Sequence, residues 1–403
     1  MRSWFGRGTA VRSTETAVDA TPGRRAQEDV PAAPNVLLLI GEFTSGGAEA
    51  LVATLANRLS LDRWKVRLSA RRDGPVSRRL GDPSGLTIVP KRWTVDPVHL
   101  LGLIRLIRGQ GIDLVHAHLF GTNVYGFLAA LAAGARIIQT VHGMSCLGSR
   151  KRIAAYRVMA PLVDRIVTVS DYLEQEMLAR ARIPKKKLCT IPNGIDPPPE
   201  LSDAERSSLR AELGLESRLP IIGTIGNVKR VKGHDVLVQA APSILRHYPN
   251  AVILVVGDTL EDPCYKSELD RSIERCNLTN AVKFLGYRPD ARKILSLFDV
   301  FVLPSRSEGL SLALLEAMGC SRPIVATRVG GTTGVLGHGR TGLLVPPDDP
   351  NVLSRSVLRI LDDPVLATAL GTQAVATARR LYSTDTMVAR YKKLYLEVSR
   401  GSR

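Results

Sequence analysis

The sequence predicts an α/β protein with two doubly wound halves, each built on a parallel sheet. Buried strand patterns alternate with helix patterns from Asn35 to Ser170, and a second alternation begins at Pro220. Between the two stretches stands the segment Asn193-Gly194-Ile195-Asp196, followed by three prolines through which no strand or helix can run. We therefore expect two sheets that are joined by a stiff linker.

The first half opens with the apolar run 36–40, which has the continuous hydrophobicity of a strand buried on both faces. A loop with glycines follows over 41–47, and then a helix pattern runs from Ala48 to Leu59. Further strands are expected over 64–70, 86–89, 113–118, 136–141 and 165–169, and further helices over 97–108 and 120–133.

The second half is organised around residues 303–319. Asp299 to Leu303 has the pattern of a short buried strand, Leu310 to Met318 that of a helix, and Glu308 and Gly309 fall on the turn between them. Further strands are expected over 220–226, 251–257, 282–285 and 323–327, and further helices over 234–248 and 382–398.

The turn at Glu308 and Gly309 has the features of a ligand site. Ligands of parallel α/β sheets gather outside the carboxyl ends of strands, where the free N–H groups of a following helix favour an anion. Gly309 allows the backbone to approach a phosphate closely. Glu308 and Glu316, with seven residues between them, are poor phosphate ligands, but both accept hydrogen bonds from sugar or ribose hydroxyls.

The two acids stand in the contexts Ser305-Arg306-Ser307-Glu308-Gly309 and Glu316-Ala317-Met318-Gly319. The segment 322–327 (Arg-Pro-Ile-Val-Ala-Thr) and the pair Gly330-Gly331 follow in register. On these residues the sequence resembles glycosyltransferase family 4, whose members are retaining enzymes of the GT-B fold. The resemblance extends over residues 35–398 and is densest from 221 to 347.

The resemblance implies catalytic roles for three residues. Lys232 would stabilise the diphosphate, Glu308 would bind sugar hydroxyls near the reacting carbon, and His118 would assist at that carbon from the facing half. Without the resemblance, a lone histidine at a strand end is usually only a hydrogen-bonded polar residue. We expect Glu308, Glu316 and Lys232 to line a wet cleft rather than a core.

The loop 41–47 also resembles a family loop, in which Gly-Gly-x-Glu faces the donor diphosphate and the acceptor. Gly46, Gly47 and Glu49 match that pattern, and His142 in the context Thr-Val-His-Gly matches a family site; Glu49 and His142 are placed on the acceptor side. The residues expected to bind the donor are Gly46, Gly47, Asn227, Arg230, Lys232, Glu308, Gly309, Leu310, Ser311 and Glu316, with Glu316 on the ribose.

Two positions depart from the family. The family usually has an arginine five residues before Lys232, and this sequence has Asn227 there. Arginine makes bidentate phosphate contacts that asparagine cannot make, so we expect Arg230 of the same loop to replace it. Gly334 stands where the family often has a glutamate after Gly-Gly-x-x.

A metal-independent reaction is expected. Many nucleotide-sugar enzymes hold a divalent metal with an Asp-x-Asp motif, and this sequence has none. Lys232 and the start of the helix after Ser311 would then supply the positive charge. No metal site and no cofactor is predicted.

Composition and charge limit the classes of partner that the chain is expected to bind. The chain has 403 residues, 44% of them hydrophobic, and a net charge of +17. The excess is largest in residues 1–200, where 28 Lys and Arg face 17 Asp and Glu. An anionic membrane surface fits this excess better than nucleic acid, because no nucleic-acid-binding motif accompanies it. Five scattered cysteines without a C-x-x-C pair, and no apolar run long enough to span a bilayer, favour a cytoplasmic protein, peripheral on the inner face of the membrane.

The predicted domains are a disordered tail over 1–34, two sheet domains over 35–196 and 197–381, and a final helical segment over 382–403. The resemblance implies that the first sheet domain is on the acceptor side, that the second binds the nucleotide sugar, and that the final helix returns to the first domain. The predicted function is transfer of a sugar from a UDP- or GDP-sugar to a glycan or lipid-linked acceptor. Three alternatives remain: a nucleotide-sugar epimerase of the same fold, a non-catalytic module that binds glycans or anions, and a protein that binds nucleic acid through its basic half.

Overall fold

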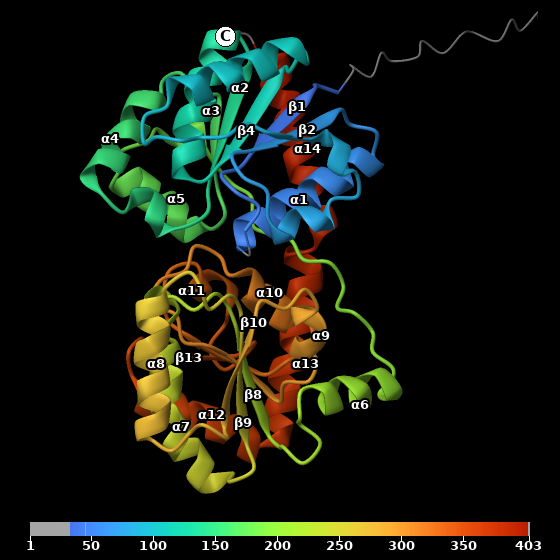
Figure 1. Cartoon of the computed structure of the whole chain (residues 1–403), viewed down its shortest axis with the longest axis vertical. Helices are drawn as coiled ribbons and strands as arrows, with labels where there is room; N and C mark the ends of the chain where they lie inside the picture. Colours follow the sequence, from blue (N-terminus) through green and yellow to red (C-terminus); the bar gives the residue numbers. More distant parts are fainter. Residues whose placement is uncertain (1–32, 45, 402–403) are drawn as a thin grey trace, which may run out of the picture. The chain divides into compact units, whose positions relative to one another are not determined.

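A computed structural model of the chain describes residues 33–44 and 46–401. These residues form two sheets whose paired strands are all parallel, and Figure 1 shows helices on both faces of each sheet. The first sheet has seven strands in the order β3-β2-β1-β4-β5-β6-β7, and the second has six in the order β10-β9-β8-β11-β12-β13. The predicted fold class is therefore confirmed.

The first sheet and its helices occupy the chain as far as Thr190. Strand β1 is buried along its whole length because it pairs with β2 on one side and β4 on the other. The strands are β1 (Val36–Leu39), β2 (Val66–Ala70), β3 (Leu86–Ile88), β4 (Leu114–His118), β5 (Arg136–Val141), β6 (Arg165–Thr168) and β7 (Leu188–Thr190). The helices are α1 (Gly47–Leu61), α2 (Pro97–Gly109), α3 (Phe120–Ala133), α4 (Arg150–Met159) and α5 (Asp171–Ala179).

Helix α6 (Asp203–Glu212) precedes the second sheet, and a capping box between Ser202 and Glu205 stabilises its first turn. The strands of the second sheet are β8 (Ile221–Ile225), β9 (Val252–Val256), β10 (Val282–Gly286), β11 (Val300–Leu303), β12 (Ile324–Thr327) and β13 (Leu343–Val345). The accompanying helices are α7 (His234–His247), α8 (Pro263–Arg275), α9 (Ala291–Leu295), α10 (Leu312–Gly319), α11 (Thr332–Val335), α12 (Pro350–Asp362) and α13 (Pro364–Leu381).

Both sheets reverse their strand order at one point, and the expected site residues lie there. The reversal falls between β1 and β4 in the first sheet and between β8 and β11 in the second. Ligands of open α/β sheets bind outside the carboxyl ends of the strands at such a point. His118 is the last residue of β4, and the loops after β1, β8 and β11 carry Gly46, Lys232 and Glu308, so the topology brings the predicted residues to the position that favours a ligand.

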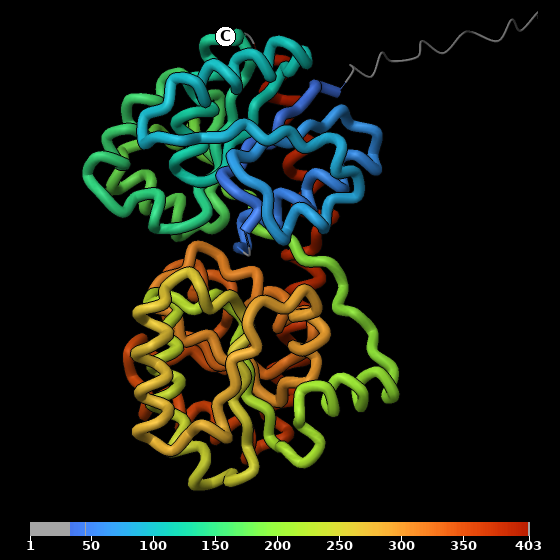
Figure 2. Tube along the Cα trace, in the orientation of Figure 1, coloured from blue at the N-terminus to red at the C-terminus, as the bar shows by residue number. Residues whose placement is uncertain are grey.

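The last helix, α14 (Thr384–Arg400), packs against the first sheet, as the sequence predicted. Its buried face includes Tyr391, Leu394 and Tyr395, which share a core cluster with β1 and with helix α1. The chain therefore crosses between the halves twice, near residue 195 and near residue 383, and Figure 2 traces both passages. The two segments pair: Ile195 N donates to Tyr382 O (2.8 Å) and Thr384 N donates to Ile195 O (3.0 Å).

Several predicted boundaries move by one or two residues, and side-chain caps explain two of the shifts. Helix α10 begins at Leu312 rather than Leu310 because the Ser311 hydroxyl accepts from Leu314 N. Helix α14 begins at Thr384 rather than Tyr382 because Ser383 caps it in the same way. The predicted tail lies outside the described residues up to Ala32, and the domain limits at residues 196 and 381 stay predictions.

Candidate active site

The segment 304–311 between β11 and α10 carries two residues of the sequence prediction, Glu308 and Gly309. A Cβ atom at Gly309 would overlap the carbonyl oxygen of His142, which belongs to the first half of the chain. A Cβ atom at Gly331 would in turn overlap Gly309 O, and Gly330 has a φ of +48° beside Glu308. Glycine is required at these positions because three backbone segments meet without room for a side chain.

An ion pair joins this segment to the loop after β8. Lys232 Nζ lies 2.8 Å from Glu308 Oε1, and the Ser305 hydroxyl donates to the same oxygen at 2.6 Å. The Glu308 side chain is 7% exposed and that of Lys232 is 28% exposed. The expectation of a wet cleft was therefore wrong for Glu308: its carboxylate is buried because Lys232 and Ser305 replace its water.

Glu316 lies in helix α10, with seven residues between it and Glu308 in the sequence. Its Oε1 lies 3.5 Å from Nε of Arg292, a residue of α9. Burial raises the pKa of the Glu316 carboxyl, and the charge of Arg292 opposes that rise. Arg292 also donates from Nη2 to the carbonyl oxygens of Asp196 and Pro197, each at 2.7 Å. The predicted ribose-binding carboxylate thus contacts a side chain that is anchored to the linker between the halves.

Three histidines gather at the carboxyl ends of β4 and β5 in the first sheet. His118 Nδ1 lies 3.0 Å from His142 Nε2, so the structure brings together the two histidines that the sequence singled out. The ring of His116 lies 4.1 Å from that of His118 between centroids. His116 is held by the hydroxyls of Tyr395 (2.6 Å) and Thr140 (2.7 Å), so helix α14 contacts this group directly.

Burial keeps these imidazoles neutral. Desolvation lowers the pKa of His142 to about 4 and that of His116 to about 3. The pKa of His118 falls well below its ordinary value for the same reason, with a smaller contribution from its neighbour His116. His118 Nε2 is buried and has no hydrogen-bond partner among the described residues. A neutral imidazole of this kind can form a hydrogen bond with a ligand hydroxyl without introducing a charge.

The loop before α1 packs on an acid of the first turn of the helix. Glu49 is 8% exposed, and a Cβ atom at Gly46 would displace its carboxylate. Burial raises the pKa of the Glu49 carboxyl, and the charge of Lys229, from the loop after β8, opposes the rise. A Cβ atom at Gly47 would lie 3.5 Å from Leu312 Cδ1 of α10. The start of α1 therefore faces two segments of the second half, the loop after β8 and the start of α10.

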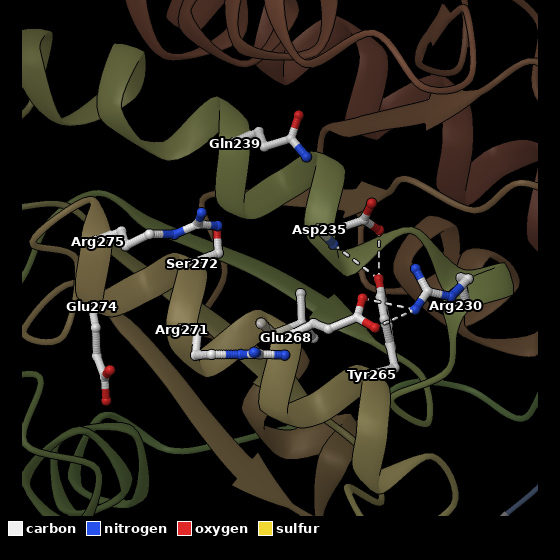
Figure 3. A pocket seen from close by; sticks show the side chains of 10 residues that line it. Arg230, Asp235, Gln239, Tyr265, Glu268, Arg271, Ser272, Glu274 and Arg275 are labelled. Atoms are coloured by element: carbon white, nitrogen blue, oxygen red, sulfur yellow. Dashed lines mark hydrogen bonds and ion pairs between the residues drawn. The ribbon is translucent and has the colours of Figure 1, made fainter.

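The loop after β8 places Asn227 and Arg230 differently from each other. Asn227 Nδ2 donates to Glu261 Oε1 at 3.0 Å, and Asp258 N donates to Asn227 Oδ1 at 3.3 Å. Arg230 instead points toward α8, where Nη2 donates to both oxygens of Glu268 at 2.7 and 2.8 Å (Figure 3). Its guanidinium lies 5.0 Å from the Tyr265 ring centroid.

No group of three or more His, Cys, Asp or Glu side chains that could hold a metal ion occurs within residues 33–44 and 46–401. The predictions of a metal-free reaction and of no cofactor stay predictions, because the side chains alone do not test them.

Three contacts at the site escaped the sequence reasoning. His116 and His118 stand two residues apart, which places both on one face of a strand, and that spacing could have revealed His116. Asn193 donates from Nδ2 to Leu310 O at 3.0 Å and so ties the linker to the donor segment, although it was read only as part of a hinge. Arg292 had no signal in the sequence, because only the fold brings it to Glu316.

Acidification should destabilise the protein through these histidines. Each buried imidazole has a folded-state pKa below its unfolded value of about 6.5, so the unfolded chain binds more protons as the pH falls below that value. The free energy of unfolding should drop from pH 6.5 toward pH 4, by up to about 1.4 kcal/mol per pH unit for each histidine. Urea unfolding between pH 7 and pH 4.5 measures the slope.

The matched variants are His116→Gln, which should have a shallower slope, and His247→Gln, an exposed position that should keep the wild-type slope. Equal slopes for wild type and His116→Gln would contradict the proposed neutral state of His116.

Two family profiles match the chain. The profile described as Glycosyltransferase Family 4 matches residues 45–198, and the profile described as Glycosyl transferases group 1 matches residues 219–363. The UDP-Gal:alpha-D-GlcNAc-diphosphoundecaprenol alpha-1,3-galactosyltransferase of Escherichia coli is 26% identical over 322 residues, which cover 76% of this chain and 82% of that protein. The N-acetyl-alpha-D-glucosaminyl L-malate synthase of Bacillus anthracis is 28% identical over 300 residues, which cover 73% and 77% of the two chains.

Solved structures support the fold. HepE of Anabaena, in complex with UDP and glucose, superposes with a TM-score of 0.82 at 21% identity, over 90% of this chain and all of that one. Sucrose-phosphate synthase of Thermosynechococcus elongatus superposes with a TM-score of 0.78 at 23% identity, over 91% of this chain and all of that one. Both profiles, the relatives and the two-sheet architecture agree: the chain belongs to glycosyltransferase family 4, and it is a retaining glycosyltransferase of the GT-B fold that uses a nucleotide-sugar donor.

Proposed function

We propose that this glycosyltransferase transfers a hexose from a UDP-sugar to a lipid-linked or glycan acceptor without a divalent metal, with a GDP-sugar as the second candidate donor. The observation that carries the proposal is the Lys232–Glu308 pair at the point where the second sheet reverses its strand order. The relatives support a UDP-sugar, because the E. coli protein is described as using UDP-Gal and HepE was solved with UDP.

The donor bond breaks between the reacting carbon of the sugar and the diphosphate, and the electron pair leaves with the diphosphate. We assign the stabilisation of that charge to Lys232, because a fixed cation in a half-buried position acts more strongly than one in water. Glu308 Oε1 accepts from Lys232 and Ser305, and we assign Oε2 to a sugar hydroxyl. Glu316 would accept from the ribose hydroxyls.

The first half would supply the acceptor side. The acceptor hydroxyl passes its proton to an oxygen of the departing diphosphate as its own oxygen bonds the reacting carbon. His118 is the group that we place near that carbon, because its buried Nε2 has no partner among the described residues and its ring is neutral. Glu49 and His142 would line the acceptor side, since Glu49 lies in the first turn of α1, beside the first loop, and His142 contacts both His118 and the Gly309 segment.

A panel of UDP-, GDP- and ADP-sugars, each with and without acceptor lipid extract, tests the reaction class. We expect release of a nucleoside diphosphate that depends on the acceptor and that persists in EDTA, because Lys232 is charged whatever the metal content. Activity that EDTA abolishes and Mg²⁺ or Mn²⁺ restores would overturn the metal-free reaction. Conversion of the donor to an epimer without acceptor would instead favour an epimerase.

The site residues can be tested by near-isosteric changes. Glu308→Gln, Glu316→Gln and Lys232→Gln should each lower turnover by at least about 10²-fold, because each removes a charge from a site that is organised in advance. Glutamine keeps hydrogen bonds in place of Glu308 and Glu316, so thermal unfolding of these two variants should shift little. Lys232→Gln leaves the buried Glu308 carboxylate without its cation and should also unfold at a lower temperature, so its turnover is measured where circular dichroism shows it folded.

The controls are Glu274→Gln and Lys293→Gln on the same half, which should keep wild-type turnover. Near-normal turnover of folded Lys232→Gln would show that another group carries the diphosphate.

The first half also offers a surface for an anionic membrane. Helix α2 buries Leu103 and Ile107, as a helix beside a sheet should, yet Val98 and Leu101 on its outer face are 66% and 49% exposed. Trp93, just before the helix, is 58% exposed. The basic residues nearby are Lys91, Arg92, Arg105 and Arg108.

Asp96 is the single acid between residues 86 and 112, and it is occupied in capping α2. Exposed apolar side chains among unneutralised cations fit a lipid headgroup layer and would hold the enzyme near a lipid-linked acceptor. No described helix has the length and apolarity of a membrane span.

Liposome co-sedimentation tests the membrane surface. We expect binding to anionic vesicles at low salt, weakened at high salt, and little binding to neutral vesicles, since each basic residue near the surface adds about 1 kcal/mol. The double variant Arg92→Glu with Arg105→Glu should lose most of this binding. Arg275→Glu, on the second half, is the control. Absence of wild-type binding to anionic vesicles at low salt would remove the membrane proposal and leave the transferase proposal standing.

A further inference from the structure

The loop after β8 leaves one question of chemistry open, because Asn227 stands where the family usually has an arginine. We propose that Lys229, and not Arg230, supplies the second cation that contacts the donor diphosphate beside Lys232. The inference rests on the proposed function and assigns a diphosphate-binding residue of this chain that the family motif does not predict. The alternative from the sequence was Arg230.

The partners of the two side chains separate Lys229 from Arg230. Residues 230–232 form a 3-10 turn, closed by the hydrogen bond from Lys232 N to Lys229 O (2.8 Å). Lys229 precedes this turn with an extended backbone (φ −136°, ψ 147°), and its ammonium group pairs with Glu261. The charges of Lys229 and Lys232 are close enough to interact, whereas Arg230 pairs with Glu268 of α8.

Arg230 is held by other side chains. Its guanidinium binds both carboxylate oxygens of Glu268 and lies over the ring of Tyr265, whose hydroxyl donates to Asp235. These partners belong to α7 and α8, and Figure 3 shows Arg230 directed into this group. To reach a phosphate beside Lys232, Arg230 would have to leave both the ion pair with Glu268 and the ring of Tyr265.

Lys229 lies between the cation of Lys232 and several carboxylates. Its ammonium group pairs with Glu261 and interacts with Glu49 in the first turn of α1, next to the loop that resembles the family's diphosphate-facing loop. Burial lowers the pKa of Lys229, and the nearby charge of Lys232 lowers it further, while Glu49, Asp258 and Asp262 raise it. Two neighbouring ammonium groups repel each other, and a bound diphosphate would relieve that repulsion.

Asn227 then has a positioning role of its own. Its amide donates to Glu261 Oε1, while Lys229 pairs with Glu261 Oε2. Asn227 therefore holds the carboxylate that holds Lys229 when no donor is bound. When a donor diphosphate arrives, it competes with Glu261 for the Lys229 ammonium group, so the missing arginine charge is supplied from two residues further along the loop.

Isothermal titration calorimetry on the full chain tests the assignment without requiring the acceptor. The ligands are UDP and uridine, or GDP and guanosine if wild type prefers GDP. Lys229→Gln should weaken binding of the diphosphate by about tenfold or more, because a hydrogen bond to a charged group is lost. Its affinity for the nucleoside should stay unchanged, since the nucleoside has no phosphate. Lys229→Arg should bind the diphosphate nearly as tightly as wild type.

Arg230→Gln is the rival variant and Lys266→Gln the control; both should bind the diphosphate as wild type does. The proposal is overturned if folded Lys229→Gln binds the diphosphate normally, or if Arg230→Gln loses as much affinity as Lys229→Gln. A different result marks failure of the proposed function itself: wild type would then bind none of UDP, GDP and ADP.

Discussion

The site of the second half depends on the ion pair between Lys232 and Glu308. A buried carboxylate is costly without a partner, so Glu308 can occupy its place only where Lys232 and Ser305 reach it. Those two residues lie on the loops after β8 and β11, the strands on either side of the strand-order reversal. The pair therefore ties together the two loops that the parallel topology brings to the ligand edge.

Close contacts between backbone segments also hold the Glu308 segment in place. Gly233 adopts a φ of +67° where a side chain would overlap Pro304 O, and Gly330 and Gly331 pack in the same way on Glu308 and Gly309. In these contacts the backbones of neighbouring segments pack directly against the Glu308 segment and fix its position. The glycines therefore help to position the Glu308 carboxylate, although they have no side chains that could contact a ligand.

The first half uses burial rather than ion pairing. His116, His118 and His142 sit in a dry environment that favours their neutral forms, and the hydroxyl of Tyr395 brings the far end of the chain to the same group. The crossing of residues 193–197 with 382–384 makes this possible, because it returns α14 to the first sheet. The linker also contacts the donor side through Asn193 and Arg292. Both halves of the site are thereby connected to the segment that joins them.

The sequence by itself determined the two-sheet architecture, the linker and the family, because these depend on local signals: apolar runs of strand length, glycines and prolines at turns, and two acids at a set spacing. The resemblance to the family singled out Glu308, Lys232, His118 and His142 as candidates, each at or just after the end of an expected strand. Only the tertiary structure decided which partners those residues have. Arg292 and Tyr395 are far in the sequence from the residues that they contact. Lys229 is adjacent to Arg230, and nothing in the local sequence distinguishes the two. The choice between them follows from the carboxylates that each side chain meets, Glu268 of α8 for Arg230, and both Glu261 and the α1 residue Glu49 for Lys229, which only folding brings near.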